Sequence, residues 1–454
     1  MGRMFGTDGV RGVAGTELTI ELAMKLGQAG AYVLTKEREH QPTIIVGCDT
    51  RISGGMLANA LMAGICSVGA NAIYAGVVPT PAIAYLARKH KVDAGVVISA
   101  SHNPMEFNGI KFFDGEGYKL SDQLEDEIEA LIRNNMKDVP MPTGSGIGKV
   151  EYRLDIKDEY VRFIKKTVPL NLSGMKIVVD CAEGAAYYTS VKTLRELGAN
   201  LVPLHIHPDG TNINSNCGST HMEELRARVV YERADIGLAF DGDADRMLAV
   251  DETGNVVDGD QIMAIIGSHM KKQGSLKNDT VVVTVMTNLG FTLMGEREGL
   301  HIEKTKVGDR YVLEQMRTEG FTLGGEQSGH IIFLDYMTTG DGELSAVQLL
   351  TLLRESGQTL SQAAGKMQVY PQVLVNLSAT AEMKAMLEEP EVKEEIIARS
   401  SPLEGNGRVL VRPSGTEPLI RVMVEGPDIT VTEAVAQDIA QWLKTIKEPC
   451  GVGV

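Results

Sequence analysis

The sequence predicts an α/β protein made of three tandem α/β domains with mixed, mainly parallel sheets, followed by a smaller α+β domain. Three observations support this prediction. At 454 residues the chain exceeds what one hydrophobic core supports, and domains average roughly 150 residues. A strand–helix rhythm starts three times along the chain, and the C-terminal segment has a different pattern.

The first third of the chain alternates helix-like and strand-like patterns. Apolar residues at helical spacing predict helices over Leu18 to Leu34 and Gly54 to Val68. Short apolar runs predict strands at Thr43 to Val46 and Ala94 to Ser99. Because this alternation is typical of crossover connections, it predicts a largely parallel sheet.

The same rhythm begins again twice. The predicted strands of the second domain are Lys176 to Asp180, Asn200 to Leu204 and Ile236 to Asp241, and those of the third domain are Thr280 to Val285, Ile302 to Thr305 and Phe321 to Leu323. The two repeats therefore predict two further α/β domains.

The last segment differs in character. It predicts strands at Val373 to Leu377, Arg408 to Arg412 and Leu419 to Glu425, with helices over Ala381 to Arg399 and Thr432 to Lys447. Two of these strands flank a turn, which favours an antiparallel sheet in an α+β domain.

Turn-rich segments at Pro140 to Gly148, Asp251 to Asn255 and Met367 to Pro371 are candidate boundaries. We therefore expect domains at residues 1–150, 151–252, 253–367 and 368–454.

Composition excludes several classes of partner. The formal net charge of -16, with no basic run, disfavours nucleic acid and anionic membranes. No apolar run reaches the length of a membrane span. The five cysteines are scattered and form no Cys-x-x-Cys pair, so we expect a reducing, cytoplasmic location.

The segment Asp241-Gly242-Asp243-Ala244-Asp245-Arg246 is the strongest local signal for chemistry. Carboxylates at alternate positions, separated by small residues, can converge on one hard cation such as Mg²⁺. An EF-hand loop would need glycine where Arg246 stands and helices where LAF and MLAV are typical of strands. A solvated acidic turn is the simpler alternative, but the density of carboxylates favours a magnesium site.

Ser101 lies in the segment Ile98 to Pro104, after a strand with a buried pattern. The carboxyl ends of parallel strands commonly carry functional loops, so Ser101 is a candidate for reactive chemistry. No Gly-x-Ser-x-Gly elbow surrounds it, which disfavours a hydrolase nucleophile. Taken alone, a Ser-His-Asn-Pro turn is more often structural.

Three other loops have the composition of a sugar-phosphate site. Arg412 to Pro418, with Arg421 beyond, gathers hydroxyl and guanidinium groups around one turn, which favours phosphate over a plain hairpin. Gly324 to His330 combines a carboxylate, a hydroxyl and an imidazole, although a structural glycine turn explains it about as well. In Phe5 to Gly12, Arg11 is either a phosphate contact or a surface charge.

Taken in order, the segments FGTDGVRG, ISASHNP, DGDADR, GGEQSGH and RPSGTEP closely resemble those of the α-D-phosphohexomutase superfamily. The resemblance covers essentially the whole chain. GEQSGH, together with Val307 to Tyr311, is most similar to the bacterial branch that acts on amino-sugar phosphates. Members that act as phosphomannomutase/phosphoglucomutase commonly carry Met at the position of Gln327.

The resemblance implies four domains around a central cleft, which carry in chain order the phosphoserine, metal-binding, sugar-binding and phosphate-binding loops, and one Mg²⁺ per subunit. It implies that Ser101 is a phosphoserine and that its phosphoryl group contacts the metal held by Asp241, Asp243 and Asp245. Lys111, Arg246 and His330 complete the implied catalytic set; Lys111 and His330 are alternative general acid/base groups, and Lys111 would need a lowered pKa. The implied substrate-binding residues are Arg11, Glu326, Ser328, Arg412, Ser414, Gly415, Thr416 and Arg421.

The implied reaction interconverts glucosamine 6-phosphate and glucosamine 1-phosphate, with glucosamine 1,6-bisphosphate as intermediate or primer. It would supply UDP-N-acetylglucosamine for cell-wall precursors. The implied partner is a small sugar phosphate, and a homodimer is a family expectation. The alternatives are mutase chemistry on glucose or mannose phosphates, a serine phosphatase, and a non-catalytic sugar-phosphate sensor.

Overall fold

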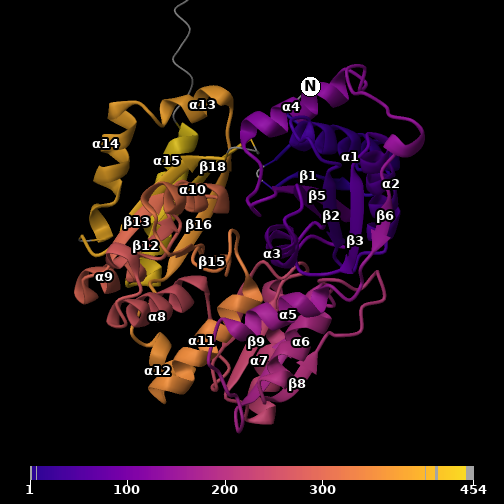
Figure 1. The fold of residues 1–454 in the computed structure, drawn as a ribbon. Helices are drawn as coiled ribbons and strands as arrows, with labels where there is room; N and C mark the ends of the chain where they lie inside the picture. The colour runs from indigo at the N-terminus through magenta and orange to yellow at the C-terminus, as the bar shows by residue number, and fades with distance from the viewer. Residues whose placement is uncertain (1–2, 7, 404, 415–417, 446–454) are drawn as a thin grey trace, which may run out of the picture. The chain divides into compact units, whose positions relative to one another are not determined.

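The structure, a computed structural model, describes residues 3–6, 8–403, 405–414 and 418–445 (Figure 1). The chain forms two compact units: Met1–Met286 with Glu298–Lys366, and Thr287–Arg297 with Met367–Val454. The first unit contains three separate sheets and the second contains one. Three α/β domains and a C-terminal α+β domain agree with the predicted fold class.

The first sheet has the strand order β1-β5-β4-β2-β3-β6. Its central strands are parallel, whereas β5 pairs antiparallel with both β4 and β1, so the sheet is mixed. Helices α1 and α2 pack together on this domain (Figure 1). The elements are β1 (Val10–Val13), α1 (Ile20–Thr35), β2 (Thr43–Cys48), α2 (Ser53–Ser67), β3 (Asn71–Val77), α3 (Thr80–His90), β4 (Ala94–Ile98), β5 (Phe107–Asp114), α4 (Asp122–Arg133) and β6 (Val150–Tyr152).

The second sheet has the order β11-β10-β9-β7-β8. Strands β7, β8 and β9 are parallel, and β9 turns back into antiparallel β10. The elements are α5 (Lys157–Lys166), β7 (Lys176–Asp180), α6 (Ala186–Glu196), β8 (Asn200–Leu204), α7 (Glu223–Glu232), β9 (Ile236–Phe240), β10 (Met247–Val250) and β11 (Val256–Val257).

The third sheet has the order β13-β12-β14-β15, with β14 and β15 forming a hairpin. The third predicted strand of this domain, Phe321 to Leu323, begins instead at Leu323 and continues into Gly325. The elements are α8 (Gly259–Lys272), β12 (Thr280–Thr284), β13 (His301–Thr305), α10 (Asp309–Glu319), β14 (Leu323–Gly325), β15 (Ile331–Phe333), α11 (Gly342–Ser356) and α12 (Leu360–Ala364).

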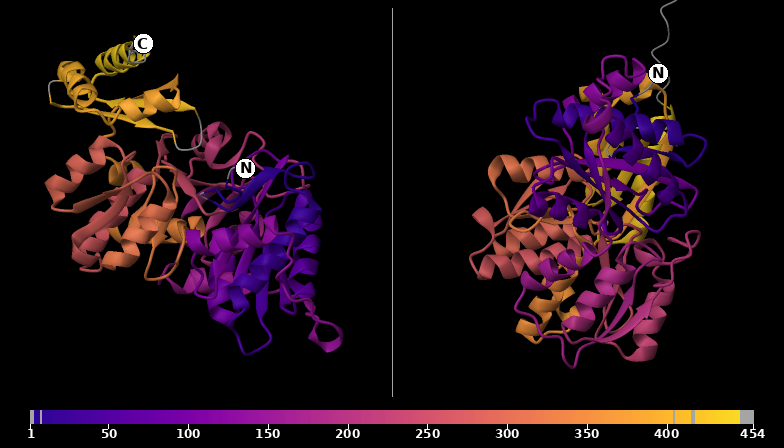
Figure 2. Two further views of the ribbon diagram at one scale, coloured as in Figure 1. Left: turned by 90° about the horizontal axis from the view of Figure 1, so that it is seen from above. Right: turned by 45° about the vertical axis from the view of Figure 1, so that its right-hand side comes forward.

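The second unit contains an antiparallel sheet in the order β16-β18-β17, against which α15 packs (Figure 2). The prediction of one helix over Ala381 to Arg399 is wrong, because Pro390 begins a new helix after a break. Proline lacks the N–H that a continuing helix needs, but suits a first turn. The elements are α9 (Leu289–Glu298), β16 (Gln372–Ser378), α13 (Ala381–Met386), α14 (Pro390–Arg399), β17 (Arg408–Pro413), β18 (Leu419–Glu425) and α15 (Ile429–Thr445).

Membrane-spanning potential and the state of the cysteines were both predicted from the sequence. Among them, no helix is both long and apolar enough to cross a bilayer. The four described cysteines, Cys48, Cys66, Cys181 and Cys217, are free thiols in buried positions, and Cys450 lies outside the described residues.

Candidate active site

The hydroxyl of Ser101 lies in a buried loop directly after β4. The Ser101 backbone has φ 51°, a left-handed conformation that is uncommon for a residue with a side chain. Its N–H donates to Ser99 Oγ at 2.9 Å, and Ser99 Oγ in turn donates to Asp49 Oδ2 at 2.6 Å. This chain of hydrogen bonds holds the strained turn and fixes the direction of the Ser101 side chain.

The carbonyl groups of this loop are held by a buried arginine that the sequence reasoning did not single out. Arg51 Nη2 donates to the carbonyl oxygens of Ser101 at 2.9 Å and Asn103 at 2.8 Å. Its Nε donates to Asp49 Oδ2 at 2.9 Å, so the guanidinium is charge-compensated. The planar fork of arginine suits several acceptors in fixed directions.

The three aspartates of the DGDADR segment lie in the turn between β9 and β10. Their side chains are buried, and one carboxylate oxygen from each lies within 4.8 Å of the others. Gly242 makes this approach to the Ser101 loop sterically feasible, because a Cβ there would lie 2.5 Å from the Ser101 carbonyl oxygen. The hairpin therefore carries the aspartates against Ser101.

Ser101 Oγ donates a hydrogen bond to Asp241 Oδ2 at 2.6 Å. Asp243 is held from a different element, because Thr80 Oγ1 donates to Asp243 Oδ2 at 2.7 Å. The structure thus brings the serine and the acidic cluster, 140 residues apart in sequence, into direct contact.

The acidic cluster has the electrostatics of a cation site. Burial and the neighbouring carboxylates of Asp245 and Asp243 hold the pKa of Asp241 well above its ordinary value. Among the described residues, Asp243 Oδ1 and Asp245 Oδ1 are buried and have no hydrogen-bond partner. Buried oxygens without partners are costly, and a hard divalent cation would satisfy them. The donor set therefore fits Mg²⁺.

Lys111 is the buried cation next to this cluster. Its Nζ lies 2.9 Å from both Asp243 Oδ2 and Asp8 Oδ2, and 3.9 Å from Asp245 Oδ2. Although burial opposes the charge, these carboxylates raise the pKa of Lys111 above its ordinary value.

Two arginines that the sequence analysis predicts as site residues, Arg246 and Arg11, lie next to the same cluster. Arg246 Nη1 is 3.2 Å from His102 Nδ1, and Arg246 Nε is 3.8 Å from Asp245 Oδ1. Arg11 pairs with Asp8, the carboxylate that also contacts Lys111. Both guanidinium groups therefore add positive charge around the acidic cluster.

His330, the residue directly before β15, lies near the cluster in the domain of the third sheet. The Gly340 N–H donates to His330 Nε2 at 3.1 Å, which assigns Nε2 as an acceptor and leaves the proton on Nδ1. Nδ1 lies 3.6 Å from Asp245 Oδ2. The ring is thus oriented from both sides.

Glu326 and Ser328 lie in the hairpin turn that leads to His330. Burial raises the pKa of Glu326 above its ordinary value. Among the described residues, the Ser328 hydroxyl is buried without a hydrogen-bond partner. The Ser328 hydroxyl is therefore available to a ligand that brings its own hydroxyls.

A cation bridge that the sequence reasoning missed joins the first and third sheets. Lys119 Nζ lies 2.9 Å from Asp8 Oδ1 and also pairs with Asp309, whose Oδ2 is 3.4 Å from His330 Nε2. Asp8 belongs to the FGTDGVRG motif and could have been found there, whereas Lys119 had no local signal.

In the second unit, Arg412 and Arg421 are directly opposite each other on β17 and β18. Burial and the charge of Arg421 lower the pKa of Arg412. Like charges facing each other across strands are unfavourable unless an anion joins them. Lys384 Nζ donates to the Ser414 carbonyl at 2.8 Å, and Gly415 and Thr416 lie outside the described residues.

Family models for phosphoglucomutase/phosphomannomutase match the chain in four parts. The α/β/α domain I model matches residues 2–138, domain II residues 158–254, domain III residues 258–370 and the C-terminal domain residues 374–441. The chain belongs to the phosphoglucomutase/phosphomannomutase family. The four family domains appear in tandem, as the predicted fold class requires.

Curated relatives of this phosphoglucomutase/phosphomannomutase family member match nearly end to end. A phosphoglucosamine mutase of Clostridium novyi (strain NT) is 59% identical over 445 residues, 98% of this chain and 99% of the relative. One of Acetivibrio thermocellus is 57% identical over 453 residues, 99% of this chain and 100% of the relative.

Among solved structures, a phosphoglucomutase/phosphomannomutase family protein from Burkholderia thailandensis aligns with a TM-score of 0.81. It is 22% identical and the alignment covers 98% of each chain, so it supports the fold.

Proposed function

We propose that this protein interconverts glucosamine 6-phosphate and glucosamine 1-phosphate through a phosphoserine at Ser101. The observation that carries the proposal is the 2.6 Å hydrogen bond from Ser101 Oγ to Asp241 Oδ2, because it joins a strained, buried hydroxyl to a metal-type carboxylate cluster. The amino-sugar substrate is supported by curated relatives named phosphoglucosamine mutase at 56–59% identity.

The reaction is a pair of phosphoryl transfers. The Oγ–P bond of phosphorylated Ser101 breaks as a bond forms between phosphorus and the sugar O1, whose proton passes to a general base. This gives glucosamine 1,6-bisphosphate. After the intermediate turns around, its O6–P bond breaks, O6 takes up a proton, and Ser101 Oγ regains the phosphoryl group.

Charge neutralisation is the main task of the site, because phosphoryl transfer needs alignment and electrostatic stabilisation more than covalent help. Lys111 and Arg246 contact the acidic cluster and would neutralise the phosphoryl oxygens. Asp241, Asp243, Asp245 and a phosphoserine oxygen would hold one Mg²⁺ per subunit. When bound, this ion supplies positive charge to the transferring group.

Proton transfer has two candidates, Lys111 and His330. The contacts of Lys111 with Asp8 and Asp243 suit a fixed cation better than a base. We therefore favour His330 for proton transfer. A His330→Gln variant with an unchanged pH profile of kcat would contradict this assignment.

Binding of the sugar and of its second phosphate is assigned to separate loops. We propose that Glu326 and Ser328 bind sugar hydroxyls, supported by the unpartnered Ser328 hydroxyl among the described residues. We propose that Arg412 and Arg421, with Ser414, Gly415 and Thr416, hold phosphate in the second unit, and that Arg11 contacts phosphate in the first. The facing pair Arg412 and Arg421 supports this role in the second unit.

The deciding experiment measures mutase rates on the 6-phosphates of glucosamine, glucose and mannose, each with its 1,6-bisphosphate as primer. We expect the highest kcat/KM with glucosamine 6-phosphate. Equal or faster turnover of glucose or mannose 6-phosphate would instead favour a phosphoglucomutase/phosphomannomutase. Steady release of inorganic phosphate would favour a serine phosphatase.

The covalent step has its own test. Ser101→Ala should lower turnover by at least about 1000-fold, as removal of a covalent catalyst does. Intact mass after incubation with glucosamine 1,6-bisphosphate should show one added phosphoryl group that maps to Ser101. Mutase turnover that survives Ser101→Ala would refute the mechanism. A cytoplasmic location and a homodimer are further parts of the proposal, to be checked by fractionation and by solution mass.

A further inference from the structure

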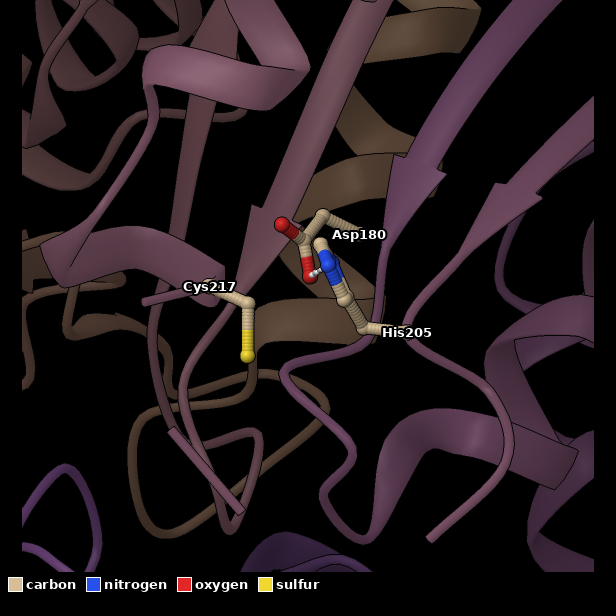
Figure 3. Close-up of side chains that lie close together, drawn as sticks. All are labelled: Asp180, His205 and Cys217. Carbon is tan, nitrogen blue, oxygen red and sulfur yellow. Dashed lines mark ion pairs between the residues drawn. The ribbon is translucent and has the colours of Figure 1, made fainter. Parts of the chain in front are cut away.

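A second cluster of metal-ligand side chains lies in the second sheet's domain. Asp180 ends β7, His205 directly follows β8, and Cys217 precedes α7, so three segments contribute one residue each (Figure 3). One ligand atom from each lies within 4.8 Å of the others. None of these residues belongs to the proposed phosphoryl-transfer site.

The three side chains are positioned mainly by their surroundings. Asp180 Oδ1 accepts the Ala182 N–H at 2.8 Å and Asp180 Oδ2 accepts the Gly218 N–H at 3.0 Å. A carboxylate oxygen has two lone pairs, so each keeps capacity for another partner. Asp180 and Cys217 are almost fully buried.

The imidazole of His205 has a metal-ligand orientation. Its Nδ1 forms an ion pair with Asp180 Oδ1 at 3.0 Å and makes no hydrogen bond to any other described residue. Its Nε2 is 3.4 Å from Glu224 Oε2. Metal-bound histidines usually direct their other ring nitrogen at a carboxylate in this way.

Charge and access also favour a cation. Asp180 most strongly, and Glu224 and Glu183 with it, raise the pKa of His205 above its ordinary value, so the surroundings of the ring favour positive charge. His205 is 20% exposed and Glu224 is 58% exposed, which leaves an entry path for an ion from the solvent side.

We propose that Asp180, His205 and Cys217 bind a zinc ion through Oδ1, Nδ1 and Sγ, with water in the fourth position. A mixed oxygen, nitrogen and sulfur set is typical of zinc, whereas Mg²⁺ prefers oxygen alone. The ion would join the carboxyl ends of β7 and β8 to the segment before α7.

The proposed ion would act on the Ser101 loop from a distance. Asn214, three residues before Cys217, donates through Nδ2 to the carbonyl oxygens of Ser101 at 2.9 Å and Asn103 at 3.1 Å. Ligation of Cys217 by the ion would restrain the segment that contains Asn214 and makes these contacts. The zinc is thus a positioning element and takes no part in the phosphoryl transfer.

Cobalt(II) is a suitable probe, because thiolate ligation produces an intense near-ultraviolet charge-transfer band and oxygen ligation does not. The full chain is stripped of metal and then saturated with Mg²⁺, so that the cluster of Asp241, Asp243 and Asp245 is occupied. It is then titrated with Co²⁺. We expect the band to grow to one equivalent and to vanish when Zn²⁺ is added. Absence of the band in the folded wild-type protein would overturn the proposal. Asp180 and His205 would then form an ion pair that binds no metal.

Two pairs of variants localise the site. Cys217→Ala should lose the band, whereas Cys181→Ala, the same change at a buried thiol one residue from Asp180, should keep it. Glu224→Gln should weaken Zn²⁺ binding about tenfold, as loss of a ligand-orienting carboxylate does. Glu223→Gln, the same change at the adjacent exposed residue, should leave the affinity unchanged. The two glutamine variants, at exposed positions, keep the test valid if Cys217→Ala misfolds. Equal Zn²⁺ affinities in Glu224→Gln and Glu223→Gln would contradict the proposed site.

Discussion

The Arg51 guanidinium donates to the Ser101 carbonyl oxygen at 2.9 Å, which ties the reactive loop to a buried cation 50 residues earlier. The same guanidinium reaches the Asn103 and Pro104 carbonyl oxygens. Arg51 is almost fully buried, so its contacts are not exchanged with water. Its role is to position the loop, since it touches the backbone and not the Ser101 hydroxyl.

Arg51→Lys should therefore damage catalysis by loosening the loop. A lysine ammonium does not reproduce the planar fork, and misplaced reacting groups lose rate steeply. We expect kcat to fall about tenfold or more with a smaller change in KM, measured by steady-state kinetics. Arg38→Lys, the same change at an exposed arginine, is the control. Equal kcat in the two variants would contradict the positioning role.

Mg²⁺ should stabilise the protein through the acidic cluster even without substrate. An ion that binds only the folded state adds about 2.7 kcal/mol at 100 times its dissociation constant. Thermal unfolding with and without Mg²⁺ should show a higher Tm in the wild type and a much smaller shift in Asp243→Asn. Asp209→Asn, at an exposed aspartate, should keep the full shift. If Asp243→Asn kept it too, the cation would bind elsewhere.

Asp341, the N-cap of α11, should make stability depend on pH. Its Oδ1 accepts the Leu344 N–H at 2.9 Å and the Tyr160 hydroxyl at 2.8 Å. Burial raises the pKa of Asp341 from its ordinary 3.8 to about 7. Between these values the folded chain holds a proton that the unfolded chain has released. The free energy of unfolding should therefore fall as the pH rises from 3.8 to about 7.

Asp341→Asn removes this titration and keeps the Oδ1 acceptor. Relative to wild type, the variant should gain stability between pH 5 and pH 8, on the order of a few kcal/mol. Urea unfolding at the two pH values measures the difference. Asp335→Asn, at an exposed site, controls for the general effect of charge removal. A wild-type-like pH slope in Asp341→Asn would show that Asp341 is ionised in the folded state.

Helices α1 and α2 approach each other so closely that side chains are excluded. A Cβ on Gly64 would lie 2.1 Å from the Met24 carbonyl oxygen, whereas one on Gly55, in the same helix, would meet nothing within 4 Å. Gly64→Ala should cost about 1–3 kcal/mol of unfolding free energy, and Gly55→Ala should add about 0.5–1 kcal/mol. Urea unfolding compares the two, and a stabilising Gly64→Ala would disprove the close packing.

Much of the fold was predictable because its signals are local. Strands such as Lys176–Asp180 are short apolar runs, and this pattern is visible in residues that are adjacent in sequence. The error at Pro390 has a local cause too: the acidic, helical pattern on both sides concealed the break that the missing N–H imposes.

The candidate site was predictable only where its groups are close in sequence. Asp241, Asp243 and Asp245 form a recognisable pattern, whereas the Ser101 turn, which taken alone is more often structural, gained its significance from the ordered set of motifs. Arg51, Lys119 and Asn214 have no such pattern, because their partners are 50 to 190 residues away. Their importance follows from burial and distance alone.

The sequence by itself determined the α/β architecture, the hydroxyl and the acidic cluster, because periodicity and short motifs depend on neighbouring residues. Only the tertiary structure decided which charges meet. It places Lys111 between Asp8 and Asp243, which raises the pKa of Lys111 instead of lowering it. It also brings Asp180, His205 and Cys217 together from three separate segments of the chain. Electrostatic effects depend on distance and burial, which a linear sequence does not specify.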